Sequence, residues 1–157
     1  MKIKGLFCAV TVAVIVGGCS TPGSGPPRSL TTKQCPPAAC DATITVDSAG
    51  NISIDADVLK MSPHDRDTVI TWILDAPNTY EFRAGSITPH TGAPTSGKET
   101  TSQSTWNSQI RHQVNTAKRV IAINKNDDKV TLYYDVKVYV KGTQNFVGID
   151  PAMANDP

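Results

Sequence analysis

A stretch of strictly alternating residues, Lys129–Lys141 (KVTLYYDVKVYVK), places the strongest constraint on how this chain can fold. Val, Leu or Tyr occupies every second position, and Lys, Thr, Asp or Tyr occupies the positions between. Because successive side chains of a strand point to opposite faces, this pattern gives one apolar face and one polar face. Valine and tyrosine are also favoured strand residues. The sequence therefore predicts a long strand in a sheet that packs on one side and meets water on the other.

Shorter runs of strand-forming residues, divided by turn residues, make up most of the rest of the chain. The run Thr68–Leu74 is apolar on both faces, which indicates a central strand. Arg119–Asn124 precedes the long strand across Lys125–Asp128, whose turn-forming residues predict a hairpin. We therefore expect an all-β fold, a single antiparallel β-sandwich of about seven strands without a helix. The other expected strands are Ala42–Val46, Ile52–Val58, Thr79–Arg83, Ser86–Thr88 and Asn145–Ile149.

The first residues have the features of a bacterial export signal. Lys2 and Lys4 form a positive start, and Leu6–Val16 is an apolar run too short to span a bilayer. The run ends in Val16-Gly17-Gly18-Cys19, which resembles the lipobox of bacterial lipoproteins. That resemblance implies that residues 1–18 are a signal peptide and that Cys19 is lipidated at the mature N-terminus. An ordinary cleaved signal followed by an incidental cysteine is the alternative.

The residues after Cys19 bear on where the protein is held. Ser20, in place of an aspartate, resembles lipoproteins that are passed on to the outer membrane. Residues 19–34 are rich in Pro, Gly and Ser and predict a lipidated tether, with residues 35–157 forming the folded domain. Several acyl chains on one cysteine give a stable anchor, whereas a single chain binds a bilayer only marginally.

Two cysteines remain in the folded domain once the signal and the anchor are set aside. Of the four cysteines in the chain, Cys8 leaves with the signal and Cys19 carries the lipid. Cys35 and Cys40 are then an even pair in an oxidising compartment, which predicts a disulfide. A disulfide across C-P-P-A-A-C closes a small loop and is expected to stabilise the folded state by about 2 kcal/mol. The spacing is not the C-x-x-C of redox enzymes, so we expect a structural disulfide.

A long polar segment, residues 89–108, does not fit a compact sandwich. It is composed almost entirely of polar, small and turn-forming residues, and loops of this length are usually functional or disordered. Trp106 is the one large aromatic residue in it. The tryptophan could be an anchor for a partner, or it could fold back onto its own domain, as apolar side chains more often do.

Several classes of function find no support in the sequence. The chain has 15 Lys and Arg against 14 Asp and Glu, which gives no reason to expect nucleic acid as a partner. A blue-copper site is excluded because no cysteine lies near a histidine or methionine in the last strands. The turn His64–Asp67 is interpreted as solvated charges rather than a metal site. With no nucleophile elbow and no phosphate loop, we expect no catalytic residue, metal or cofactor.

The polar face of the long strand carries Tyr133 and Tyr139 with Lys137 between them. An aromatic and basic stripe of this kind could bind a glycan or a peptide. The alternative is an ordinary half-exposed sheet face, since tyrosine is favoured in strands in any case.

The folded part also resembles a group of uncharacterised bacterial β-sandwich proteins, the DP-EP type. The resemblance is carried by Trp72 and Leu74, by Phe82, by the long YDVKVYV strand and by Asp150-Pro151 near the C-terminus. It covers most of residues 42–155 and departs from the pattern in the insert at 89–108. It implies a sandwich of the immunoglobulin or cupredoxin type and supplies no activity.

These observations together predict a lipid-anchored protein of the bacterial cell envelope, with the outer membrane as its expected destination. We expect a non-catalytic binding or structural module exposed to the periplasm, held in the bilayer through acylated Cys19, with an envelope protein or a glycan as partner. The alternative is a periplasmic enzyme or small-ligand carrier with a site near the 89–108 loop, using His90 or His112.

Overall fold

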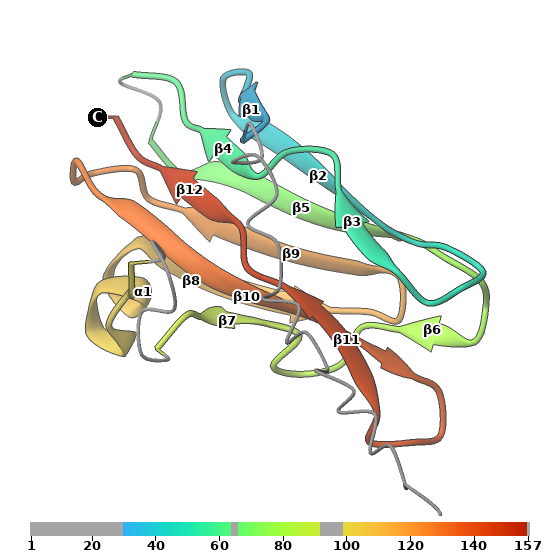
Figure 1. Ribbon diagram of the computed structural model, residues 1–157. Coiled ribbons are helices and arrows are strands. Elements are labelled where there is room, and N and C mark those ends of the chain that lie inside the picture. The colour runs from blue at the N-terminus through green and yellow to red at the C-terminus, as the bar shows by residue number, and fades with distance from the viewer. Residues whose placement is uncertain (1–29, 64–65, 92–98, 157) are drawn as a thin grey trace, which may run out of the picture.

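The computed structural model describes residues 30–63, 66–91 and 99–156 (Figure 1). Within these residues the chain forms two mixed β-sheets that pack on each other and one short helix. A mostly β, sandwich-like fold is therefore confirmed. The expected signal peptide, Cys19, most of the tether and the His64-Asp65 turn lie outside the described residues.

The larger sheet is built around strand β10 (Thr131–Val140), the long alternating stretch. Val136 pairs with Ile149 on one neighbour and with Ile87 on another, so β10 is paired along both edges. Its inward side chains, Leu132, Tyr134, Val136 and Val138, are fully buried, which confirms the predicted apolar face. The other strands of this sheet are β1 (Thr32–Gln34), β4 (Val58–Lys60), β6 (Tyr80–Glu81), β7 (Ile87–Pro89), β11 (Phe146–Ile149) and β12 (Ala152–Ala154).

The smaller sheet has β5 (Thr68–Asp75) at its centre, as its apolar sequence predicts. It is paired with one neighbour in parallel and with the other antiparallel. The sheet runs in the order β3 (Ile52–Ile54), β2 (Ala39–Val46), β5, β9 (Arg119–Asn124) and β8 (Ile110–Asn115).

Three expectations about the sheets are wrong. The sheets are mixed rather than antiparallel, because β2–β5, β1–β4 and β4–β12 are parallel pairs. The expected hairpin between β9 and β10 does not form: the two strands lie in different sheets, and β9 pairs with β8 instead. The expected strand at 52–58 is divided between the sheets, with β3 in one and β4 in the other, and buried Ala56 lies in the crossing segment. The number of strands differs as well, since the described residues form twelve strands where about seven were expected.

The expected polar loop contains a helix, α1 (Gln103–Gln109), beside β8 (Figure 1). The Ser102 side chain caps it by accepting a hydrogen bond from the Thr105 backbone N–H at 3.1 Å, which satisfies one of the free donors of the first turn. Gln103 and Asn107, one turn apart, are joined by a side-chain hydrogen bond of 2.9 Å. The prediction of a helix-free chain is therefore wrong.

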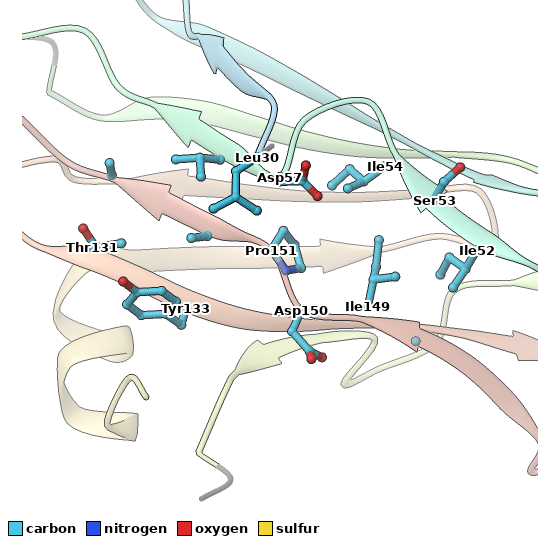
Figure 2. A pocket seen from close by; sticks show the side chains of 14 residues that line it. Leu30, Ile52, Ser53, Ile54, Asp57, Thr131, Tyr133, Ile149, Asp150 and Pro151 are labelled. Atoms are coloured by element: carbon cyan, nitrogen blue, oxygen red, sulfur yellow. The ribbon is translucent and has the colours of Figure 1, made fainter. Parts of the chain in front are cut away.

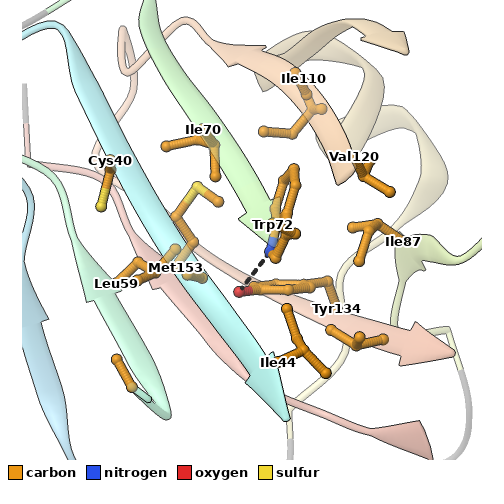
Figure 3. Packing of buried hydrophobic residues seen from close by; sticks show 14 of the residues in the cluster. Cys40, Ile44, Leu59, Ile70, Trp72, Ile87, Ile110, Val120, Tyr134 and Met153 are labelled. Atoms are coloured by element: carbon orange, nitrogen blue, oxygen red, sulfur yellow. Dashed lines mark hydrogen bonds between the residues drawn. The ribbon is translucent and has the colours of Figure 1, made fainter. Parts of the chain in front are cut away.

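An aromatic pair lies at the centre of the core between the two sheets (Figure 3). The Trp72 indole N–H donates to the Tyr134 hydroxyl at 3.3 Å, and the two rings meet edge to face. Both residues are fully buried, so this bond satisfies polar groups that water cannot reach. Burial is also the main reason that the pKa of Tyr134 is raised well above its ordinary value.

The disulfide between Cys35 and Cys40 is present, as predicted, with the Cα atoms 5.1 Å apart. Cys35 follows β1 of the larger sheet, and Cys40 lies in β2 of the smaller one. The bond therefore closes a corner between the sheets. Because Thr32–Gln34 already pairs with β4, the folded part includes residues that the sequence placed at the end of the tether.

Candidate functional site

A groove of about 770 Å³ lies at the edge of the larger sheet, where β3 of the smaller sheet comes next to β11 (Figure 2). Thr131 and Tyr133, which point away from the core, line it from β10. Its floor includes the small residues Gly148, Ala152 and Ala154. The volume is within the usual range for sites that hold small molecules.

Aliphatic side chains form the walls of the groove. Ile52 and Ile54 of β3 lie on one side of the groove. Ile149, the last residue of β11, and Pro151, two residues further on, lie on the other side (Figure 2). The groove therefore lies where the edge of the smaller sheet comes next to the larger one. Its polar lining includes Asp150, and among the described lining residues the ionisable groups other than Tyr133 are carboxylates.

One end of the groove adjoins a cluster of His90, Asp135 and Asp150, which we call the histidine–aspartate cluster. The His90 Nδ1 lies 2.6 Å from the Asp135 Oδ1, and both side chains are largely buried. One ligand atom from each of the three residues lies within 4.8 Å of those of the other two. Asp150 belongs to both the cluster and the groove lining, so the two features are continuous.

Strand register explains why these three residues meet. Asp135 of β10 pairs with Thr88 of β7, and the His90 backbone N–H continues that ladder by donating to the Tyr133 carbonyl at 2.9 Å. On the other edge of β10, Val136 pairs with Ile149, which places Asp150 beside Asp135. Directly paired residues project from the same face of a sheet, and successive residues of one strand alternate between faces. Asp135, His90 and Asp150 therefore all project from the outer face.

Tyr133 lies between the cluster and the groove. Its backbone N–H donates to the Thr101 hydroxyl at 2.7 Å, and the Thr101 N–H donates to the His90 carbonyl at 2.9 Å. Partial burial raises the pKa of the Tyr133 hydroxyl, and the nearby Glu99 carboxylate, to which it is hydrogen-bonded, raises it further. The hydroxyl therefore stays protonated and acts as a donor at this end of the groove.

The residues proposed from the sequence as binding residues have three different surroundings. Trp106 is buried, with its ring 6.0 Å from that of Tyr134, so it folds back onto its own domain and is not exposed to a partner. Tyr139 packs against Phe146 and lies under the Arg83 guanidinium. Only Tyr133 lines the groove.

The two histidines considered for the alternative function are separated by the fold. His90 belongs to the cluster, whereas His112 lies exposed on β8 of the smaller sheet, in an irregular part of the β8–β9 pairing. Nothing in the sequence around His90 indicates Asp135 and Asp150 as its partners. Their meeting depends on which strands flank β10, and no local spacing signals it.

Comparison with known proteins found no relative, since no protein-family model and no curated protein matches the chain. The resemblances to bacterial lipoproteins and to the DP-EP type therefore stay predictions. Within the described part of the chain, no helix is both long enough and apolar enough to cross a membrane.

Proposed function

We propose that this chain is a non-catalytic lipoprotein of the bacterial cell envelope that binds a small amphipathic ligand in the groove on its larger sheet. The groove, with its aliphatic walls and its acidic end, is the observation that carries the proposal. The lipobox-like sequence ending at Cys19 supports attachment to a membrane, and Ser20 supports the outer membrane. A short tether then holds the folded domain close to the bilayer surface.

Binding is favoured over catalysis by the surroundings of His90. A histidine that activates a hydroxyl nucleophile must lie within hydrogen-bond distance of it. The His90 Nδ1 is taken by Asp135, and the Nε2 is buried without a hydrogen-bond partner among the described residues. The described residues therefore offer the His–Asp half of a catalytic arrangement without a nucleophile.

The lining indicates what kind of ligand fits. The walls are aliphatic, which suits a hydrocarbon chain better than a sugar ring, since glycans favour flat aromatic surfaces such as Tyr139, and that ring is already covered. Asp57 and Asp150 line the groove, so the polar end of a ligand is expected to be positively charged. An alkyl chain with an ammonium group combines both features.

The anchor is tested by replacing Cys19 with alanine in the full chain. We expect the unaltered protein to incorporate a palmitate analogue and to partition into detergent, because acylation supplies the membrane affinity. Cys19→Ala is expected to lose both properties, whereas Cys8→Ala, within the signal, keeps them. Labelling of Cys19→Ala at the unaltered level would contradict the anchor.

The groove is tested with three probes that share one hydrocarbon chain: dodecylamine, dodecanol and dodecanoate. The mature chain with Cys19→Ser, which carries no lipid of its own, is titrated in the presence of a chelator and followed by NMR. We expect dodecylamine to shift the amides of Tyr133, Gly148 and Ala152, and to bind at least about tenfold more tightly than dodecanoate, because the carboxylates attract one head group and repel the other.

Two variants show whether those shifts come from the groove. Ala154→Phe places a bulky ring on the groove floor and is expected to abolish binding. Val114→Phe makes a comparable change at an exposed position of β8 in the other sheet and is expected to leave binding unchanged. If all three probes bind equally tightly, the carboxylates do not select the charge of the ligand. If Ala154→Phe still binds dodecylamine, the ligand does not bind in the groove.

A further inference from the structure

We propose that His90, Asp135 and Asp150 form a binding site for a divalent transition-metal ion, with Zn²⁺ as the favoured ion. The inference goes beyond the proposed function and does not depend on the groove holding an organic ligand. It also departs from the sequence analysis, which assigned no metal site.

The spacing of the three side chains suits one ion. Their ligand atoms lie within 4.8 Å of one another, and the His90 Nδ1 is 2.6 Å from the Asp135 Oδ1. Two ligand atoms that bind the same Zn²⁺, each about 2.0–2.2 Å from the ion, are roughly 3–3.5 Å from each other. Small side-chain rotations on a fixed backbone are therefore enough to bring all three donors onto an ion.

The backbone that carries the ligands is rigid. His90 and Asp150 sit beside the two strands that flank β10, and the ladder hydrogen bonds on either side of Asp135 fix their Cα positions. Asp135 lies in a paired strand and each of the other two ligands directly follows one, so less ordering is needed when the ion binds than at a site on a free loop.

The donor set decides which ion is favoured. One imidazole nitrogen and two carboxylates suit Zn²⁺, Co²⁺ or Mn²⁺, and among these the intrinsic affinity is highest for Zn²⁺. Ca²⁺ takes six or more oxygen ligands as a rule, so it is expected to bind much more weakly to this site. Three protein ligands also leave at least one coordination position open, and Asp150 directs the site toward the groove.

A further observation points to a cation. A carboxylate oxygen of partly buried Asp135 and one of Asp150 lie within 4.8 Å of each other beside one imidazole, and a dication would offset the repulsion between the two carboxylates. Because the ligating imidazole nitrogen and carboxylates must be unprotonated, binding of the ion is expected to weaken at low pH.

The test is a titration of the full-length protein, purified from membranes in detergent and stripped of metal with a chelator. Zn²⁺, Co²⁺ and Ca²⁺ are added separately and followed by calorimetry, with the visible spectrum of Co²⁺ as a report of nitrogen and oxygen coordination. We expect one Zn²⁺ per chain, bound with a Kd on the order of 1 μM, and Ca²⁺ binding at least about 100-fold weaker.

Single substitutions connect the ion to the cluster. Asp135→Asn and Asp150→Asn keep the size of the side chain and are each expected to weaken Zn²⁺ binding by roughly 10- to 100-fold. His64→Gln and His112→Gln change the other two histidines and are expected to leave the affinity unchanged. Thermal unfolding provides a second readout, since Zn²⁺ should raise the Tm of the unaltered protein and of these two controls only.

Three results would overturn the metal site. The first is the absence of saturable Zn²⁺ binding, and the second is unchanged affinity in both aspartate variants. The third is that Asp135→Asn lowers the Tm by the same amount with and without Zn²⁺. That result would mean that the His90–Asp135 pair stabilises the fold and does not bind the ion. Because no amphipathic probe is present in this titration, its outcome is independent of the groove experiment.

Discussion

Replacing Trp106 with alanine is expected to lower the free energy of unfolding by about 3–5 kcal/mol, the usual cost of removing a buried tryptophan. The side chain is only 4% exposed and packs on the Tyr134 ring at the centre of the core. It is also one of the two buried residues of α1, the other being Gln109. A helix of seven residues is not stable alone, so loss of this contact should release α1 from the domain.

Urea unfolding followed by far-UV circular dichroism measures this change, and Asn107→Ala is the matched control. Asn107 lies on the exposed side of the same helix, where its side chain accepts a hydrogen bond from Gln103. We expect that control to lose less than about 0.5 kcal/mol. If Trp106→Ala unfolds at the same urea concentration as the unaltered protein, then Trp106 does not anchor α1.

The long strand shows what local sequence can establish about this fold. In β10 the alternation identifies the buried face residue by residue, because side-chain direction in a strand depends only on position. The central place of β5 follows in the same way from its apolar character. These properties belong to one strand at a time, so no knowledge of its neighbours is needed.

The pairing of the strands depends on long-range contacts and was predicted poorly. Lys125–Asp128 contains ordinary turn residues, yet it connects two sheets, and the buried Asn126 in it donates to the Ser62 carbonyl. The alternation in 52–58 likewise continues through a crossing from one sheet to the other. The local strand or turn pattern of both segments is the same whichever sheet they join. Packing against the rest of the domain therefore decides which sheet each segment joins.

The candidate site shows the same limit. The sequence analysis considered His90 and Tyr133 for binding, but it treated each by itself. His90 and Asp135 are 45 positions apart and meet only because β7 and β11 flank β10. For Trp106 the sequence left a partner anchor and burial in its own domain as alternatives, and favoured burial because apolar side chains more often fold back; the buried side chain on α1, which Ser102 caps, decides for burial.

A second large effect is expected from a buried network of amide side chains that joins β9 to the C-terminal end of the chain. The Asn124 amide donates to Asn155 at 2.7 Å, and Asn155 in turn donates to the Gln109 carbonyl oxygen of α1 at 3.0 Å. The Gln109 amide donates to Asp127 at 2.7 Å, and the pKa of that carboxyl is lowered by Lys125 and by this bond. The side-chain amides of Asn124, Asn155 and Gln109 therefore each donate to a partner, which offsets the cost of burying them.

Asn124→Ala is expected to lower the free energy of unfolding by about 3 kcal/mol, because it removes the buried hydrogen bonds that Asn124 makes with the Asn155 side chain and with the Asn126 backbone N–H. Asn155→Ala is expected to have a similar effect, and Asn145→Ala, at an exposed position, almost none. The double variant should cost at least about 0.5 kcal/mol less than the sum of the two single changes, since each removes the same bonds. Urea unfolding of the four proteins measures this, and strict additivity would mean that Asn124 and Asn155 act independently.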